Sequence, residues 1–397
     1  MSIRLQILPA CLALFTLLAC KKSADQSPVN PGGNQGNYSG QKLVLSSVEK
    51  VASPWVELDE NFVYTSGNIG SALFKLIPAG FENKINSFYL PKGYMVVFAA
   101  NSDGTGESAC FVASASPVKA NLPARLRNNI SYIRCMKINN PNKKGTASTS
   151  DGALQALGSA WHYTWGINRS SFPGQQFVPM TWGKNACTDN NVNYLIDRND
   201  IDHLLSFNEP DNVSQSNVPA DTAINRYKIM QRSGLRLGSP VVTQEEVTGT
   251  GNWLPAFMTK AQAQRLRIDY IAVHWYDWGN ENNNAATDSL TAERVFNRFV
   301  TYIGRVRQAY PNYPIWVTEF NANVNRSSPV VQKYFMKLST DWMNTKTYIE
   351  RYAYFFETNF PPVNPDNTLT GAGAYWKSLS SPPAFSANIT GDAVLVN

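Results

Sequence analysis

The second half of the chain alternates short apolar runs with longer stretches in which apolar residues recur at helical spacing. Three stretches show that spacing, at 221–234, 291–310 and 328–345. The runs between and around them are SAWHYTWG, QFVPMTWG, HLLSFNEP, LRLGSPVVT, DYIAVHWYDWG, PIWVTEFN and RYAYFFET. Nearly continuous apolar strands that alternate with helices indicate parallel strands buried on both faces.

This alternation predicts a (β/α)8 TIM barrel over residues 155–397. Seven strands are visible. If RYAYFFET is the eighth and HLLSFNEP the fourth, the missing strand is among the first three. A doubly wound open sheet is the alternative, but no glycine-rich phosphate loop follows any of the runs.

Residues 41–138 have a different pattern, with short β-rich runs separated by Gly, Pro, Asn and Asp, and they predict an all-β sandwich. The segment GYMVVFAANSDGTGESACF (93–111), with similar stretches at 83–94 and 128–138, resembles a βγ-crystallin-type Greek-key domain. That family binds calcium through segments that are degraded here, since Arg127 stands where an oxygen ligand would be useful. We expect a sandwich without calcium. Residues 139–154 are polar and small, and predict a linker.

The first forty residues predict export and anchoring. Residues 1–19 have an early Arg and an apolar stretch, and with Cys20 they resemble a bacterial lipoprotein signal whose cysteine is lipidated. The alternative is an ordinary signal peptide that happens to contain a cysteine. Residues 20–40 are rich in Ser, Pro, Gly and Asn, which is typical of a flexible tether. We therefore expect a lipid-anchored protein of the bacterial cell envelope, at the outer membrane or cell surface.

Charge and cysteine content exclude several functions. The net charge of +6 is not gathered into a basic stripe, so we expect no nucleic-acid partner. Separately, we expect a monomer. Without Cys11 and Cys20, three cysteines remain. Cys110 and Cys135 could form a disulfide or stay as thiols, and Cys187 is left over. No CxxC motif or paired histidine spacing occurs, so we expect neither a metal nor another cofactor.

Two glutamates end predicted strands, Glu209 in HLLSFNEP and Glu319 in PIWVTEFN. Working residues of such barrels lie at the carboxyl ends of the strands, where these two side chains can face each other. Cleavage of a glycosidic bond needs two carboxyl groups in different protonation states. Asn208, directly before Glu209, can bind a sugar 2-hydroxyl group. The alternative for each glutamate taken alone is a solvated or helix-capping side chain.

The ordered motifs FVPMTWG, LLSFNEPDN, LGSPVVT, YIAVHWY and IWVTEFN closely resemble glycoside hydrolase family 128, over nearly all of residues 155–380. The resemblance implies a retaining endo-β-1,3-glucanase with Glu209 as acid/base and Glu319 as nucleophile. It also implies β-1,3-glucan as the substrate. We expect a raised pKa to keep Glu209 protonated. The rivals are the same machinery on another β-glucan, xylan or mannan, and a surface glycan-binding protein that has lost turnover.

Other candidates come from the strand ends. His274, Trp275 and Tyr276 are candidate substrate-binding residues, with barrel-lining residues as the alternative. Candidate sugar-stacking residues, some of which we expect in the core, are Trp161, Trp165, Trp182, Trp253 and Trp278. Competing carboxylates near strand ends are Glu245, Glu246, Asp277 and Glu357.

Overall fold

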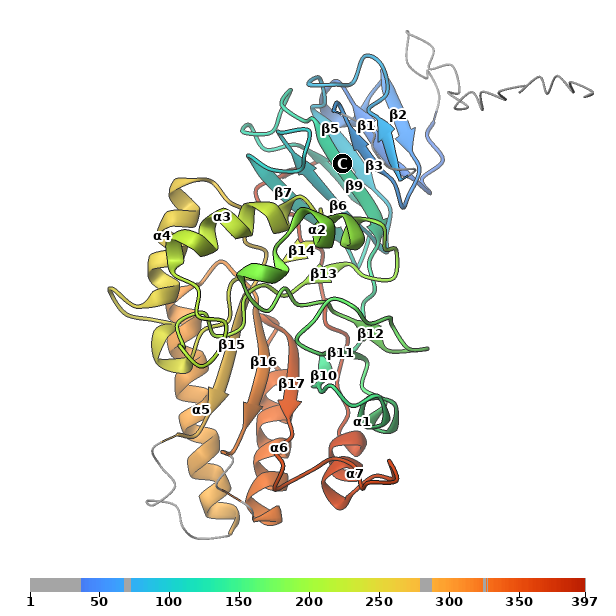
Figure 1. Cartoon of the computed structure of the whole chain (residues 1–397). Helices are drawn as coiled ribbons and strands as arrows, with labels where there is room; N and C mark the ends of the chain where they lie inside the picture. Colours follow the sequence, from blue (N-terminus) through green and yellow to red (C-terminus); the bar gives the residue numbers. More distant parts are fainter. Residues whose placement is uncertain (1–36, 68–72, 279–287, 324–325, 327, 397) are drawn as a thin grey trace, which may run out of the picture.

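The computed structural model describes residues 37–67, 73–278, 288–323, 326 and 328–396. They form a β-sandwich and, below it in Figure 1, a larger unit of parallel strands and helices. The predicted signal peptide, Cys20 and most of the predicted tether lie outside the described residues. Within these ranges, no helix has both the length and the apolar character needed to cross a membrane.

The sandwich consists of two five-stranded sheets, in the orders β18-β8-β5-β1-β2 and β4-β3-β9-β6-β7. Pairing is antiparallel except between β3 and β4. Phe88, Phe98 and Phe111 pack between the sheets with ring centroids 4.9–6.0 Å apart. The all-β prediction is confirmed, whereas the Greek-key likeness stays a prediction. The strands are β1 (Leu43–Ser46), β2 (Trp55–Leu58), β3 (Val63–Thr65), β4 (Phe74–Leu76), β5 (Ser87–Leu90), β6 (Tyr94–Ala99), β7 (Ser108–Ala113), β8 (Val118–Asn121), β9 (Tyr132–Lys137) and β18 (Val394–Leu395).

Cys110 and Cys135 lie on opposite faces of one sheet. β6 separates their strands, with Cys110 opposite Val97 and Cys135 opposite Val96. Successive residues of a strand point to opposite faces, so one thiol faces the sandwich core and the other faces away from it. Of the two alternatives left open by the sequence, the structure has free thiols, and Cys187 is free as well.

Eight parallel strand segments form a closed ring. Six pair in the order β12-β11-β10-β17-β16-β15, β13 pairs with β14, and single bridges at Met180–Leu205 and Gly238–Tyr270 complete the circuit. Trp161, Tyr270 and Trp316 fill its interior. The segments are β10 (Lys144–Ala147), β11 (Trp161–Tyr163), β12 (Gln176–Phe177), β13 (His203–Leu204), β14 (Arg236–Leu237), β15 (Ile271–Tyr276), β16 (Ile315–Asn321) and β17 (Ile349–Phe355).

The predicted linker is wrong, because residues 139–154 contain β10, the first strand of the ring. The missing strand was therefore among the first three, as predicted. Its composition hid it: Gly145 is required because a Cβ there would lie 2.2 Å from the Trp161 indole. The amines of Lys143 and Lys144 are satisfied by carbonyl groups at the ends of two helices, Lys346 O at 2.7 Å and Trp376 O at 2.7 Å. The polar residues in and beside β10 are thus compatible with a buried strand.

Helices follow seven of the eight strands in the described part of the chain, whereas β11 is followed by a loop. Side-chain oxygens of Ser150, Thr188, Asp288, Ser328 and Thr370 cap five of these helices at their amino ends. The helices are α1 (Asp151–Leu157), α2 (Asp189–Ile196), α3 (Ala220–Gln231), α4 (Trp253–Ala263), α5 (Ser289–Ala309), α6 (Pro329–Asn344) and α7 (Gly371–Ser378), with 3-10 turns at Glu49–Val51, Lys184–Ala186 and Gln244–Glu246.

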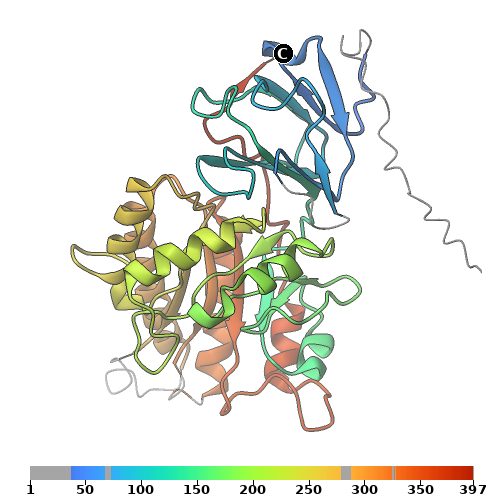
Figure 2. The same ribbon diagram turned by 45° about the horizontal axis from the view of Figure 1, so that its top comes forward.

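The segment after α7, residues 379–396, which we call the C-terminal strap, returns to the sandwich. Its backbone bridges Val112 at Ile389, and β18 extends a sandwich sheet beside β8. Figure 2 shows the C-terminus beside the blue N-terminal strands. The predicted catalytic domain of 155–397 therefore includes residues that belong to the sandwich.

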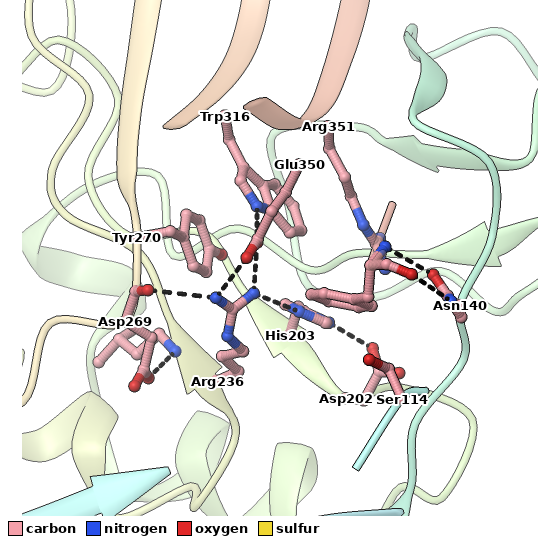
Figure 3. Close-up of polar contacts among 12 residues, drawn as sticks. Ser114, Asn140, Asp202, His203, Arg236, Asp269, Tyr270, Trp316, Glu350 and Arg351 are labelled. Carbon is pink, nitrogen blue, oxygen red and sulfur yellow. Dashed lines mark hydrogen bonds and ion pairs between the residues drawn. The ribbon is translucent and has the colours of Figure 1, made fainter. Parts of the chain in front are cut away.

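A buried ionic network closes the amino end of the strand ring (Figure 3). Arg236 donates to both carboxylate oxygens of Glu350, at 2.6 and 2.9 Å, and Trp316 Nε1 donates to the same carboxylate at 2.9 Å. His203 lies between Arg236 and Asp202. The Phe385 ring of the C-terminal strap stacks on His203. A closed, internally paired cluster at this end indicates a role in stability.

Candidate active site

The opposite, carboxyl end of the ring holds a cavity of about 710 Å³. Polar and aromatic side chains from the ends of the strands make up its wall, which is the composition of a site for polar ligands with flat apolar faces. Its lining residues are Trp165, Trp182, Asn208, Glu209, Asn212, Gln215, Thr243, Gln244, Glu245, His274, Tyr276, Trp278, Glu319, Phe355 and Glu357.

Glu209 enters this cavity from a strained turn just after β13. Its φ of 40° is in the left-handed region, which is unusual for a non-glycine residue. The conformation is held by Val241, which forms a bridge with Asn208 and accepts a hydrogen bond from the Glu209 amide at 2.6 Å. Pro210 follows and ends the strand pairing. Strain of this kind at a cavity wall is typical of functional residues.

Glu319 is held by three donors, two from β11 and the residues just after it and one from the neighbouring strand β15. Tyr163 OH and Trp165 Nε1 each donate to its Oε1 at 2.9 Å, and Tyr276 OH donates to its Oε2. Burial and the Glu319 charge raise the pKa of both tyrosines well above 10, so the hydroxyls stay protonated. These three hydrogen bonds therefore fix the orientation of the Glu319 carboxyl group.

His274 joins the two glutamates. Its Nδ1 lies 3.0 Å from Glu209 Oε1, and its Nε2 lies 3.3 Å from Glu319 Oε1. Burial alone would lower the pKa of His274, but the negative charges of Glu319 and Glu209 and the Glu209 hydrogen bond raise it. His274 thus lies between the two carboxyl groups and contacts both.

The expected raised pKa of Glu209 is wrong. Burial raises the pKa of this carboxyl group, but the hydrogen bond and charge of His274, with a hydrogen bond from Asn212 at 3.3 Å, outweigh burial and lower it below its usual value. The sequence could not show this, because it did not place a histidine against that oxygen.

Of the predicted sugar-contacting residues, Asn208, Trp165, Trp182, His274, Tyr276 and Trp278 line the cavity with the two glutamates. Trp182 and Trp278 are 36% and 47% exposed, so both side chains are accessible from solvent. These placements leave their binding role a prediction. Asp277, the residue before Trp278, is buried and pairs with Arg298 and Arg326, which fixes the base of that loop.

Three predicted tryptophans lie elsewhere. Trp161 is fully buried inside the ring, beneath Tyr163, and Trp275 points outward against Phe299 and Phe335. The Trp253 indole stacks on Phe257 of its own helix. Their predicted substrate contacts are wrong, because strand alternation turns Trp275 away from the ring and depth along β11 keeps Trp161 below the cavity.

Sequence reasoning missed several residues of the wall and of the nucleophile's support. Tyr163 lies between Trp161 and Trp165 on the same face of its strand, so two-residue alternation could have identified it. Gln215, Gln244 and Phe355 sit in loops or at a strand end and carried no such signal. Glu245 and Glu357, noted only as competitors, line the cavity, whereas Glu246 accepts a hydrogen bond from Trp253 N and is not part of the lining.

Comparisons with known proteins agree with this geometry. The family model described as glycosyl hydrolase catalytic core matches residues 138–379. The subgroup I endo-β-1,3-glucanase of glycoside hydrolase family 128 from Amycolatopsis mediterranei, in complex with laminaripentaose, is 30% identical with a TM-score of 0.50. That alignment covers 60% of this chain and 99% of the other.

A second structure of the same enzyme, with laminarihexaose, gives 29% identity and a TM-score of 0.51, over 60% of this chain and 100% of the other. A curdlan-specific exo-β-1,3-glucanase of subgroup III from Blastomyces gilchristii is 28% identical, with a TM-score of 0.48, over 60% and 100%. No curated protein sequence matches the chain. With its catalytic-core match and its family 128 relatives, the chain belongs to glycoside hydrolase family 128 and is a glycoside hydrolase.

Proposed function

We propose that this protein is a retaining endo-glycosidase that cleaves β-1,3-glucan at the cavity around Glu209 and Glu319. The observation that carries the proposal is the convergence of two glutamates from different strands on one aromatic-lined cavity, with Glu319 fixed by three donors. The similarity to an endo-β-1,3-glucanase in complex with laminaripentaose supports the choice of substrate. The strand ring, with seven following helices, supports the view that the catalytic unit is a (β/α)8 barrel.

The mechanism is a double displacement. The Glu319 carboxylate attacks the anomeric carbon, and the glycosidic C–O bond breaks as Glu209 gives its proton to the leaving oxygen. Glu209 then removes a proton from water, whose oxygen attacks the same carbon and releases Glu319. The proton that Glu209 gives in the first step reaches it from His274, 3.0 Å away along their hydrogen bond, and the proton taken from water in the second step restores it.

The proposal is tested by incubating residues 37–397 with linear β-1,3-glucan and measuring new reducing ends. We expect release by the wild-type protein and a collapse of release in both Glu209→Gln and Glu319→Gln. The anomeric configuration of the first product, followed by NMR, should match that of the substrate. Release of reducing ends only from xylan, mannan or another β-glucan would show that this polysaccharide, and not β-1,3-glucan, is the substrate. Tight binding of β-1,3-glucan without release would indicate a glycan-binding protein.

We further propose that Cys20 carries a lipid that anchors a monomer to the bacterial cell envelope, as the first twenty residues predict. Metabolic labelling with a tagged fatty acid should mark the wild-type protein and leave Cys20→Ser unmarked. Labelling of both proteins equally would overturn this assignment.

A further inference from the structure

A third carboxyl group, that of Glu357, lies in the cavity and has no part in the double displacement. Glu357 comes two residues after the end of β17 and is half-buried in the cavity wall. Within the described part of the chain it forms no ion pair. Burial raises its pKa, the hydrogen bond from Asn321 opposes this, and the negative charge of Glu319 adds to the rise. A half-buried acid placed beside a second carboxylate is unfavourable for stability, which favours a functional reason for its position.

The side chain of Glu357 is held by a rigid support. Asn321 Nδ2 donates to Glu357 Oε1 at 3.2 Å and to Phe355 O at 3.1 Å, while Asn321 Oδ1 accepts from Asn323 N at 2.7 Å. Asn321 is 1% exposed. Because this amide uses its hydrogen-bonding groups on fixed partners, it sets the position of one oxygen of Glu357. No described residue donates to the other oxygen, and the Glu357 side chain is part of the cavity wall.

Glu357 stands on the nucleophile's side of the cavity. Asn321 follows Glu319 by two residues on β16, and the Phe355 ring lies edge-on to Trp165 and Tyr276, with centroids 5.8 and 6.1 Å away. Both of those side chains donate to Glu319. The contacts of Glu209, by contrast, are His274 and Asn212. Glu357 therefore lies on the same side of the cavity as Glu319, where the sugar that becomes attached to Glu319 would be bound.

We propose that Glu357 binds hydroxyl groups of the sugar units on the nucleophile's side, and so positions the part of the glycan that becomes covalently attached. The inference rests on the proposed function. A neutral glycan carries hydroxyl groups and no positive charge, so Glu357 would bind it through hydrogen bonds and not through an ion pair. A carboxylate oxygen accepts a hydroxyl donor in a charge-assisted hydrogen bond. Glu357 then acts by holding substrate, and it makes or breaks no covalent bond.

The first test is calorimetric binding of laminarihexaose to Glu319→Gln, which cannot turn it over, and to the same protein carrying Glu357→Ala or Glu357→Gln. We expect Glu357→Ala to weaken binding about 10- to 100-fold, the range for one hydrogen bond to a charged group, and the isosteric Glu357→Gln to weaken it less. Glu293→Gln, which removes an exposed carboxylate from α5, should change nothing. Thermal unfolding of each variant shows that the fold is kept.

The second test isolates the nucleophile's side. A 2-deoxy-2-fluoro-β-laminaribiosyl fluoride should trap the otherwise wild-type enzyme: Glu319 attacks the anomeric carbon, the C–F bond breaks and fluoride leaves without an acid. We expect Glu357→Ala to raise the inhibitor concentration needed for half-maximal trapping at least tenfold. Equal binding and trapping with and without Glu357, in a parent that binds laminarihexaose, would overturn this inference alone. A parent that neither binds nor cleaves β-1,3-glucan would instead overturn the proposed function.

Discussion

The Arg236–Glu350 pair gives a sharp prediction about stability. The two side chains are 1% and 7% exposed, and they share two hydrogen bonds at 2.6 and 2.9 Å. Changing Glu350 to Gln leaves the guanidinium buried without a counter-charge and turns an amide donor toward Arg236 or Trp316. Breaking one partner of a buried pair costs about 3–5 kcal/mol, a large share of the roughly 5–15 kcal/mol that stabilises a domain.

The partner change Arg236→Met removes the uncompensated charge, so the double variant Arg236→Met/Glu350→Gln should lose less stability than Glu350→Gln alone. Equilibrium urea unfolding followed by circular dichroism measures each free energy of unfolding. The exposed pair Lys337–Asp341 is the control, since Asp341→Asn should leave the free energy of unfolding almost unchanged. The reasoning is refuted if Glu350→Gln costs no more than this control, or if the two single losses simply add.

Three further outcomes are expected. Tyr276→Phe removes one donor to Glu319 and leaves two, so kcat should fall about 10- to 100-fold with KM little changed; an unchanged kcat in a steady-state assay would contradict this. His274 has a folded-state pKa above 6.5 and Glu209 one below 4.5, so their interaction stabilises fully between about pH 4.5 and 6.5. It is lost as pH rises through the raised pKa of His274. The Tm deficit of His274→Gln should therefore correspond to about 1–2 kcal/mol in that window and shrink toward pH 9, and a pH-independent deficit would speak against the pairing. Unfolded, unreduced residues 37–397 should react with three equivalents of a thiol reagent, whereas a Cys110–Cys135 disulfide would leave one.

Periodicity predicted the ring of parallel strands well because those strands are buried on both faces. PIWVTEFN and DYIAVHWY are nearly continuous apolar runs, and each contains the strand expected of it. β10 escaped notice because its burial depends on partners far along the chain. Gly145 makes room for Trp161, and the two lysines reach helix ends that the local sequence does not reveal.

The candidate site divides in the same way. Glu209 and Glu319 could be named from strand-end position, since that rule needs only the order of elements. Whether a tryptophan faces the cavity depends on its depth along the strand and on the face of the strand it occupies. The predictions for Trp161 and Trp275 were wrong because Trp161 lies too deep and Trp275 is on the outer face. The pKa of Glu209 depended on His274, which the fold brings to 3.0 Å across 65 residues of sequence. A pKa shift of this kind comes from contacts between residues far apart in sequence, which the composition of the chain does not reveal.

The C-terminal strap has a consequence for the order in which the molecule can be completed. Domains usually fold as units, the first one while the remainder is still being synthesised. Here the sandwich receives an edge strand, β18, from residues 394–395, and Arg125 pairs with Asp392 from the same end of the chain. The first domain to emerge is therefore the last to be finished, because its own sheet is complete only after the residues of the strand ring have been synthesised.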